Sequence, residues 1–179
     1  MKIYCLCDYP QAGQVKPELA AVIGEENAAD VYEKIIYQMF RLADFVQDPF
    51  ELVFTVRGGT AKEWQDLLPG QTIIQYNEQD RTAQLNHLVT EHFSTSQEPM
   101  AIVVSDCLGI DSTTLQYASN DLQDRDLVLG PLSDGGAYLV AMKKEHCGLL
   151  DYWENEYALQ DMMNFCYEAD LSPAILDIK

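Results

Sequence analysis

Two aspartates in this sequence stand just beyond short apolar runs, a pattern that suits ligand binding. Asp106 follows the run 101–104, and Asp134 lies in a glycine-rich loop after the run 127–129. A carboxylate at a strand end can hold Mg²⁺ or Mn²⁺, which prefer oxygen ligands. Such an ion would neutralise a diphosphate. We therefore take Asp106 and Asp134 as candidate catalytic and metal-binding residues.

Each aspartate also has a purely structural interpretation. From spacing alone, Asp106 is equally suited to capping a turn or the next helix. The pair Asp134-Gly135 is a strong hairpin signal, and alone this loop is a turn more often than a site. Two strand-end carboxylates together favour the site. Their neighbours Ser105, Gly135 and Gly136 are then candidate substrate-binding residues, because glycines let the backbone approach a ligand closely.

The loop after the first apolar run, residues 9–16, is a third candidate. Such a loop often cradles a nucleotide, and a lysine in it can pair with phosphate. Pro10, Gly13 and Lys16 are its candidate substrate-binding residues, although an ordinary surface loop explains the stretch equally well.

These loops need a scaffold of alternating strands and helices. Apolar runs predict strands at 3–6, 52–56, 72–76, 101–104, 127–129 and 137–142. Helical spacing predicts a first turn at Pro17 that Gly24 ends, and then helices at 25–46, 64–68, 85–93, 112–122, 149–153 and 159–167. This alternation implies right-handed βαβ units and a mainly parallel sheet, with ligands at the carboxyl ends of the strands.

Composition limits the classes of function. With 179 residues, 11 basic and 29 acidic, the formal net charge is −18. Such a surface repels nucleic acid and anionic lipid, so we expect neither nucleic-acid nor membrane partners. The apolar stretch near the N-terminus is too short for a signal-peptide core, so we expect a cytoplasmic protein. The sequence leaves a homo-oligomer open.

The five cysteines lack the spacing of a zinc site. We expect reduced, buried thiols at Cys5, Cys147 and Cys166. Cys5 and Cys7 fall in the first predicted strand, and we assign their side chains to opposite faces of it. Cys107 has no histidine or basic residue beside it in the sequence, which argues against a nucleophile.

The three loops, taken in order, resemble one bacterial family of glycosyltransferases associated with arsenosugar biosynthesis, formerly a domain of unknown function. Its motif Ser-Asp-Cys-Pro matches Ser105-Asp106-Cys107, with Leu108 in place of proline. Its motif Gly-Pro-Ala-x-Asp-Gly-Gly-Tyr-Tyr-Leu matches residues 130–139. Its N-terminal motif keeps Pro10, Gly13 and Lys16 here. The resemblance covers roughly residues 1–142.

The resemblance implies a nucleotide-diphospho-sugar transferase (GT-A) fold. This fold belongs to the α/β class: it is a three-layer α/β/α sandwich whose central sheet is mixed but mainly parallel. We expect it to form a single domain over residues 1–179. It implies a metal-assisted glycosyltransferase that uses a nucleotide-sugar and Mg²⁺ or Mn²⁺. Asp106 would be the metal or sugar-nucleotide ligand, and Asp134 would lie over the bound sugar or a second metal.

The chain departs from the family pattern in the N-terminal loop. Asp8 replaces a basic residue and Pro17-Glu18 replaces Thr-Arg, so negative charge stands where a diphosphate is expected. A like-charge contact near a surface costs about 1–4 kcal/mol. Two alternatives therefore stay open. One is a catalytically degenerate member that binds a ligand or partner, and the other is a nucleotidyltransferase similar to 2-phospholactate guanylyltransferase.

Overall fold

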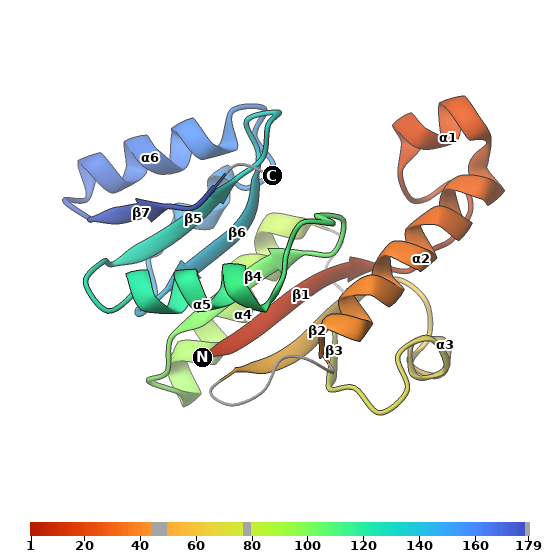
Figure 1. The fold of residues 1–179 in the computed structure, drawn as a ribbon, viewed down its shortest axis with the longest axis horizontal. Helices are drawn as coiled ribbons and strands as arrows, with labels where there is room; N and C mark the ends of the chain where they lie inside the picture. Colours follow the sequence, from red (N-terminus) through yellow and green to blue (C-terminus); the bar gives the residue numbers. More distant parts are fainter. Residues whose placement is uncertain (44–49, 77–79, 178–179) are drawn as a thin grey trace.

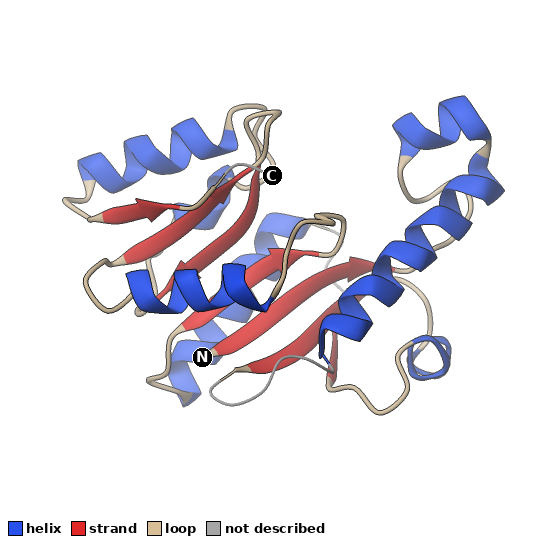
Figure 2. Ribbon diagram, viewed as in Figure 1, coloured by secondary structure: helices blue, strands red, loops and turns tan. Residues whose placement is uncertain are grey.

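The structure, a computed structural model, describes residues 1–43, 50–76 and 80–177. Its centre is a seven-stranded sheet with the order β3-β2-β1-β4-β6-β5-β7 (Figures 1 and 2). The strands are β1 (Lys2–Asp8), β2 (Glu51–Arg57), β3 (Ile73–Tyr76), β4 (Met100–Val104), β5 (Leu127–Pro131), β6 (Ala137–Met142) and β7 (Pro173–Ile175). Each predicted strand is present, and β7 is an additional one.

The sheet is mixed in the way that positions the two candidate aspartates. Strands β1, β2, β3 and β4 are parallel to one another, whereas β6 is antiparallel to both β4 and β5. Val103 pairs with Leu139 and Met100 pairs with Met142. The end of β4 and the start of β6 therefore meet at one edge of the sheet, which is also where the parallel strands β1 and β2 end.

Helices cover both faces of the sheet. They are α1 (Pro17–Ile23), α2 (Glu25–Ala43), α3 (Ala61–Leu67), α4 (Arg81–Thr95), α5 (Ser112–Asp121), the 3-10 helix η1 (Leu149–Tyr152) and α6 (Ala158–Glu168). In residues 1–43, 50–76 and 80–177, no helix combines the length and apolar character needed to span a membrane.

Strand side chains alternate between two apolar clusters. Cys5 and Phe54 pack in the cluster that α2, α3 and α5 complete, whereas Leu6 and Ile102 pack in the one that α4, η1 and α6 complete. Figure 1 shows α5 in front of the sheet and α4 behind it. The expected three-layer α/β architecture is confirmed. Val46, the last position of the predicted helix 25–46, lies outside the described residues.

The cysteines correct two expectations. Cys5 and Cys7 share one face of β1, with 3.8 Å between their Sγ atoms. The assignment to opposite faces was wrong, because residues two apart on a strand point the same way. The hydrogen bond with the Cys7 thiol, together with burial, raises the pKa of Cys5. Cys166 is buried as expected, but Cys147 is exposed because it lies in the loop between β6 and η1.

Candidate functional site

A polar cavity of about 170 Å³ lies where β1 and β4 end. Its walls come from segments far apart in the sequence, because parallel strands bring their carboxyl ends to one edge of the sheet. The lining residues are Leu6, Asp8, Lys16, Tyr32, Arg81, Val104, Ser105, Asp106, Trp153 and Glu154. We call this space the charged cavity.

One side of the charged cavity is built around Asp8, the last residue of β1. Its Oδ1 accepts a hydrogen bond from Arg57 Nε at 2.8 Å, and its Oδ2 accepts one from an Arg81 guanidinium nitrogen at 2.8 Å. Arg57 ends β2, directly opposite Asp8 in the register of the sheet. Arg81, the first residue of α4, is buried and also donates to Gln84 Oε1 at 3.0 Å. Two cations thus surround one carboxylate.

The other side pairs Lys16 with Asp106. Lys16 Nζ forms an ion pair with Asp106 Oδ2, and the two side chains are 30% and 41% exposed. The ammonium group also lies 4.8 Å from the centroid of the Tyr32 ring. Lys16 has a left-handed backbone (φ 48°), uncommon for a residue other than glycine, just before α1. The predicted phosphate-binding lysine therefore touches the predicted metal-binding aspartate.

Tyr32 of α2 links the two sides. Its hydroxyl accepts a hydrogen bond from the Asp8 backbone N–H at 3.1 Å and is hydrogen-bonded to Ser105 Oγ at 2.9 Å. Burial raises the pKa of Tyr32 far above its ordinary value, and the nearby Cys7 thiol adds to the shift. The hydroxyl is therefore neutral at physiological pH and fixes Ser105 at the wall of the cavity.

Asp134 is placed differently. Its loop is the turn of the β5–β6 hairpin, where the backbone N–H of Gly136 donates to Asp134 Oδ1 at 2.9 Å. Gly135 has φ 95°, and its carbonyl accepts a hydrogen bond from Leu159 N. The hairpin thus touches the chain just beyond Trp153 and Glu154, which line the charged cavity. Asp134 itself is exposed and is not among the lining residues.

The remaining predicted residues do not line the charged cavity. Pro10 lies in a separate hollow with Tyr9 and Tyr37. Gly13 has φ 77°, and a side chain there would meet Glu25 at 3.1 Å, so glycine is needed for the turn itself. In the described ranges, no three histidine, cysteine or carboxylate side chains are grouped to hold a metal ion. The described residues therefore do not bring three such ligands together on one ion.

The roles of Arg57 and Arg81 beside Asp8 were not predicted from the sequence. The signal for Arg81 was its position directly after Asp80, whose side chain accepts hydrogen bonds from Thr82 N and Ala83 N and so fixes the start of α4. No sequence spacing relates either arginine to Asp8, because the contact depends on strand register and on where α4 begins.

Solved structures of other proteins share this α/β fold. A "putative nucleotide-diphospho-sugar transferase" from Desulfovibrio desulfuricans G20 has a TM-score of 0.89 and 23% identity, covering 99% of this chain and 79% of its own. A nucleotidyl transferase from Methanothermobacter has a TM-score of 0.59 and 14% identity, covering 99% and 88%. Rv0371c from Mycobacterium tuberculosis H37Rv, solved in complex with manganese, has a TM-score of 0.55 and 10% identity, covering 99% and 89%.

Comparison of sequences gives the family. No curated protein matches the chain. The model of a family described as "Uncharacterized protein conserved in bacteria (DUF2064)" matches residues 39–154, more than half of the chain and a span that includes Arg57, Arg81, Asp106 and Asp134. The chain therefore belongs to the bacterial family DUF2064.

Proposed function

We propose that the protein is a glycosyltransferase that takes its sugar from a nucleoside diphosphate. The observation that carries this proposal is the charged cavity. It joins the Lys16–Asp106 pair to the cluster of Asp8, Arg57 and Arg81 at the carboxyl edge of the sheet. In open α/β sheets, ligands bind at this edge. The solved relatives, named as transferases of nucleotide substrates, support the same class.

Asp8 does not oppose a diphosphate in the way its sequence position suggested. Among the described residues, the cluster around Asp8 holds two guanidinium groups and one carboxylate. Arg81 is held by two acceptors and keeps a tenth of its side-chain surface exposed. It presents a fixed positive charge, and a guanidinium suits phosphate oxygens. Arg81 of α4 thus brings to the cavity the basic charge that the N-terminal loop lacks, and Arg57 of β2 adds its charge beside Asp8.

Lys16 is the mobile counterpart. Exposed ion pairs contribute only about 0–1 kcal/mol, so Lys16 can leave Asp106 at little cost when a phosphate arrives. Asp106 then has a free carboxylate. Mg²⁺ is commonly held by one or two carboxylates together with substrate phosphates, so one aspartate suits a metal that binds with the nucleotide. When bound, Mg²⁺ or Mn²⁺ would neutralise the leaving diphosphate.

The transfer itself is a displacement at the sugar. The acceptor hydroxyl oxygen bonds to the anomeric carbon as the bond from that carbon to the diphosphate oxygen breaks. The diphosphate leaves with the bonding electron pair, next to Lys16 and Arg81. We assign Asp134 as the base that takes the proton of the acceptor hydroxyl, because its hairpin adjoins the segment that carries Trp153 and Glu154. Pro10, Gly13, Gly135 and Gly136 shape the loops around the ligand.

Nucleotidyl transfer is the second candidate, favoured by the nucleotidyl transferase among the solved relatives. It would use the same cations on a triphosphate and would release pyrophosphate, whereas glycosyl transfer releases a nucleoside diphosphate. A binding protein without turnover is the third. It is favoured by the pairing of Lys16, Arg57 and Arg81 with carboxylates of the protein itself.

The test is a thermal-shift titration of the wild-type protein with UDP, GDP and CDP, each with and without Mn²⁺. We expect Mn²⁺ alone to leave Tm unchanged, and one nucleotide with Mn²⁺ to raise it by more than the nucleotide alone. Assays of released diphosphate and pyrophosphate then separate the two transferases. No shift with any nucleotide at millimolar concentration would overturn the proposal.

A further inference from the structure

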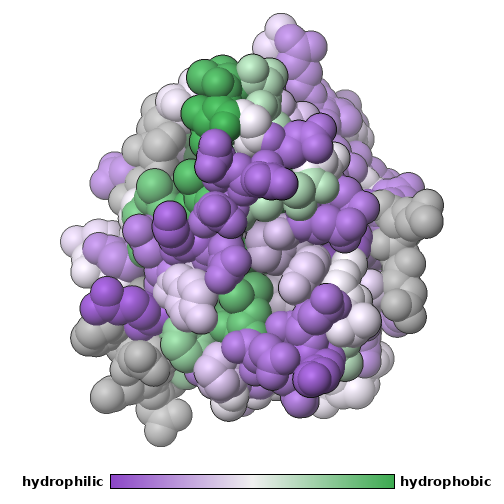
Figure 3. All heavy atoms as spheres, turned by 90° about the vertical axis from the view of Figure 1, so that its right-hand side faces the viewer, coloured by the Kyte–Doolittle hydropathy of each residue, from purple (hydrophilic) through white to green (hydrophobic). Residues whose placement is uncertain are grey.

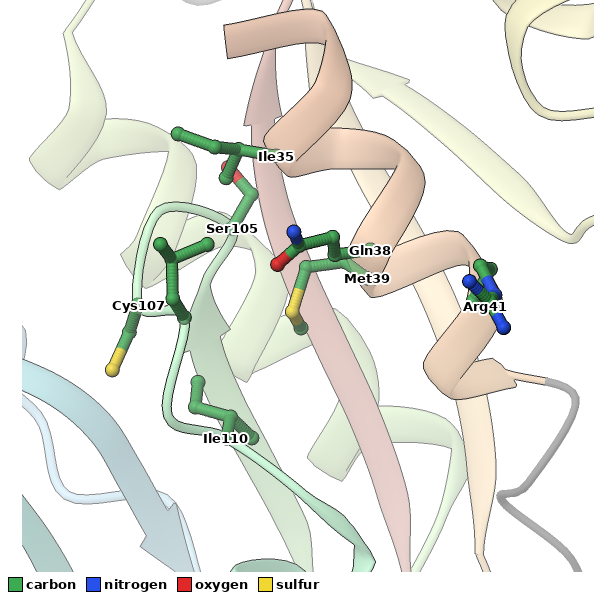
Figure 4. Close-up of a pocket in the computed structure, with 8 residues that line it drawn as sticks. Ile35, Gln38, Met39, Arg41, Ser105, Cys107 and Ile110 are labelled. Carbon is green, nitrogen blue, oxygen red and sulfur yellow. The ribbon is translucent and has the colours of Figure 1, made fainter. Parts of the chain in front are cut away.

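A second hollow adjoins the charged cavity. It is a groove of about 340 Å³ between α2 and the loop that follows β4. Ile35, Gln38, Met39 and Arg41 line it from α2, and Ser105, Cys107, Leu108 and Ile110 line it from the loop (Figure 4). Ser105 lines the charged cavity as well. A ligand in this groove would therefore lie beside the proposed nucleotide site.

The groove is apolar at one end. Met39, Cys107 and Ile110 are buried and form its floor, while Leu108 is 65% exposed at its rim. In Figure 4, Met39 points from the helix toward the loop that carries Cys107 and Ile110. A volume of this size falls within the range of small-molecule pockets, which are mostly apolar with a few polar groups that fix orientation.

The other end is polar. Arg41 lies away from the loop, at the far end of the lining residues (Figure 4). Among the described residues Arg41 has no ion pair and Gln38 has no hydrogen bond, in contrast to Lys16, Arg57 and Arg81, which are all paired. The face drawn in Figure 3 is mostly hydrophilic, and the chain has a net charge of −18. The Arg41 guanidinium is a local positive charge in such a field, and it favours a ligand with one anionic group.

We propose that this groove binds an amphipathic monoanion. Its apolar body packs on Met39, Cys107 and Ile110, and its carboxylate pairs with Arg41 at the far end of the groove. The evidence for this binding site is the groove itself and does not depend on the proposed function. A ligand of this kind that also carries a hydroxyl group would serve as the transferase acceptor, a role that rests on the proposed function because Ser105 lines both the groove and the charged cavity.

The test uses linear carboxylates of six to twelve carbons, below the concentration at which they form micelles, with decan-1-ol and decylamine as uncharged and cationic controls. Binding is followed by NMR through the methyl groups of Met39, Ile35 and Ile110. We expect the carboxylates to shift these methyls with an affinity that rises with chain length. Decan-1-ol and decylamine should bind at least about tenfold more weakly, since a hydrogen-bonded charge pair contributes about 1.5–3 kcal/mol.

Two variants give the controls. Arg41→Gln should weaken carboxylate binding about tenfold, whereas Lys34→Gln, an exposed change on the same helix outside the groove, should leave it unchanged. Leu108→Glu should also weaken it by repulsion, and Leu108 is too exposed for the change to threaten folding. Equal binding of decan-1-ol, or no effect of Arg41→Gln, would overturn the proposal.

The indole of Trp153 reports on the charged cavity in the same spectra. If nucleotides with Mn²⁺ fail to shift Trp153 while decanoate still shifts Met39, the proposed function fails and the groove remains a binding site. If nucleotides shift Trp153 but no carboxylate shifts Met39, only the groove proposal fails.

Discussion

Asp106 and Asp134 occupy equivalent places in the sequence, just beyond a strand, yet the structure gives them different surroundings. Asp106 lines the charged cavity and pairs with Lys16 from the loop after β1. Asp134 accepts a hydrogen bond from Gly136 within its own hairpin and is exposed. The two carboxylates lie at the same edge of the sheet, but among the described residues Asp106 pairs with a side chain from another loop, whereas Asp134 bonds within its own hairpin.

The difference follows from strand direction. After β4 the chain crosses to another element, so its end stands beside the end of parallel β1. After β5 the chain turns directly back into antiparallel β6, and the side chain of Asp134 bonds to the backbone of this turn. An aspartate in such a turn satisfies a backbone N–H first. An aspartate that follows a strand can therefore be assigned to the correct edge of the sheet. The segment that comes after the strand, a crossover or a hairpin turn, determines which groups the aspartate contacts.

The most direct test of the difference between Asp106 and Asp134 is to substitute each aspartate by asparagine. We expect Asp106→Asn to weaken nucleotide binding about 30-fold, because the charged partner of Lys16 or of a metal is lost. Asp134→Asn should change nucleotide affinity by less than about threefold but lower turnover about 100-fold or more, as expected for loss of a base. Calorimetric titration and steady-state assays measure the two effects.

Asparagine at position 134 can still accept the Gly136 N–H, so the hairpin is preserved in that variant. The comparison would be wrong if Asp134→Asn lost nucleotide binding as severely as Asp106→Asn. It would also be wrong if Asp134→Asn bound and turned over like the wild type, because Asp134 would then be a turn residue alone.

The next contrast concerns stability and compares the two ion-pair groups of the cavity. Asp8→Ala should lower the free energy of unfolding by about 2–3 kcal/mol, because it leaves the buried Arg81 without its carboxylate. Lys16→Met should lower it by less than about 1 kcal/mol, because the Lys16–Asp106 pair is exposed. Urea unfolding measures both values.

A matched variant isolates the role of Arg81. The double change Asp8→Ala and Arg81→Met removes both charges and should recover part of the stability lost in Asp8→Ala. If Asp8→Ala proved no more destabilising than Lys16→Met, the cluster of Asp8, Arg57 and Arg81 would be a loosely held surface network, and Arg81 could not serve as a fixed phosphate anchor.

The sequence predicted the scaffold better than the site, for a physical reason. Continuous apolar runs such as 101–104 predict buried strands directly, and all six expected strands form. The three-residue β7, which begins at Pro173, is too short for a pattern to indicate it. Side chains within one loop, such as Ser105 and Asp106, could be predicted together because the chain itself joins them. Arg57 and Arg81 could not, because their contact with Asp8 arises from register and helix placement.

The smallest contrast concerns the tyrosines beside the two aspartate loops, Tyr32 next to Ser105 and Tyr138 on β6. Burial raises the pKa of Tyr138 to about 12, and it raises the pKa of Tyr32 further. A raised pKa means that the unfolded chain loses its proton first, from about pH 10. The stability that each neutral tyrosine contributes is therefore complete below pH 10 and is lost as pH rises above it.

We expect Tyr32→Phe and Tyr138→Phe each to make the decrease of the unfolding free energy between pH 10 and 12 less steep, with the larger effect at Tyr32. Only Tyr32→Phe should also weaken nucleotide binding, by about threefold, because it alone frees Ser105 at the cavity wall. An equal loss of nucleotide affinity in Tyr138→Phe would mean that the hairpin of Asp134 contributes to binding as much as the loop of Asp106, which the surroundings of the two carboxylates contradict.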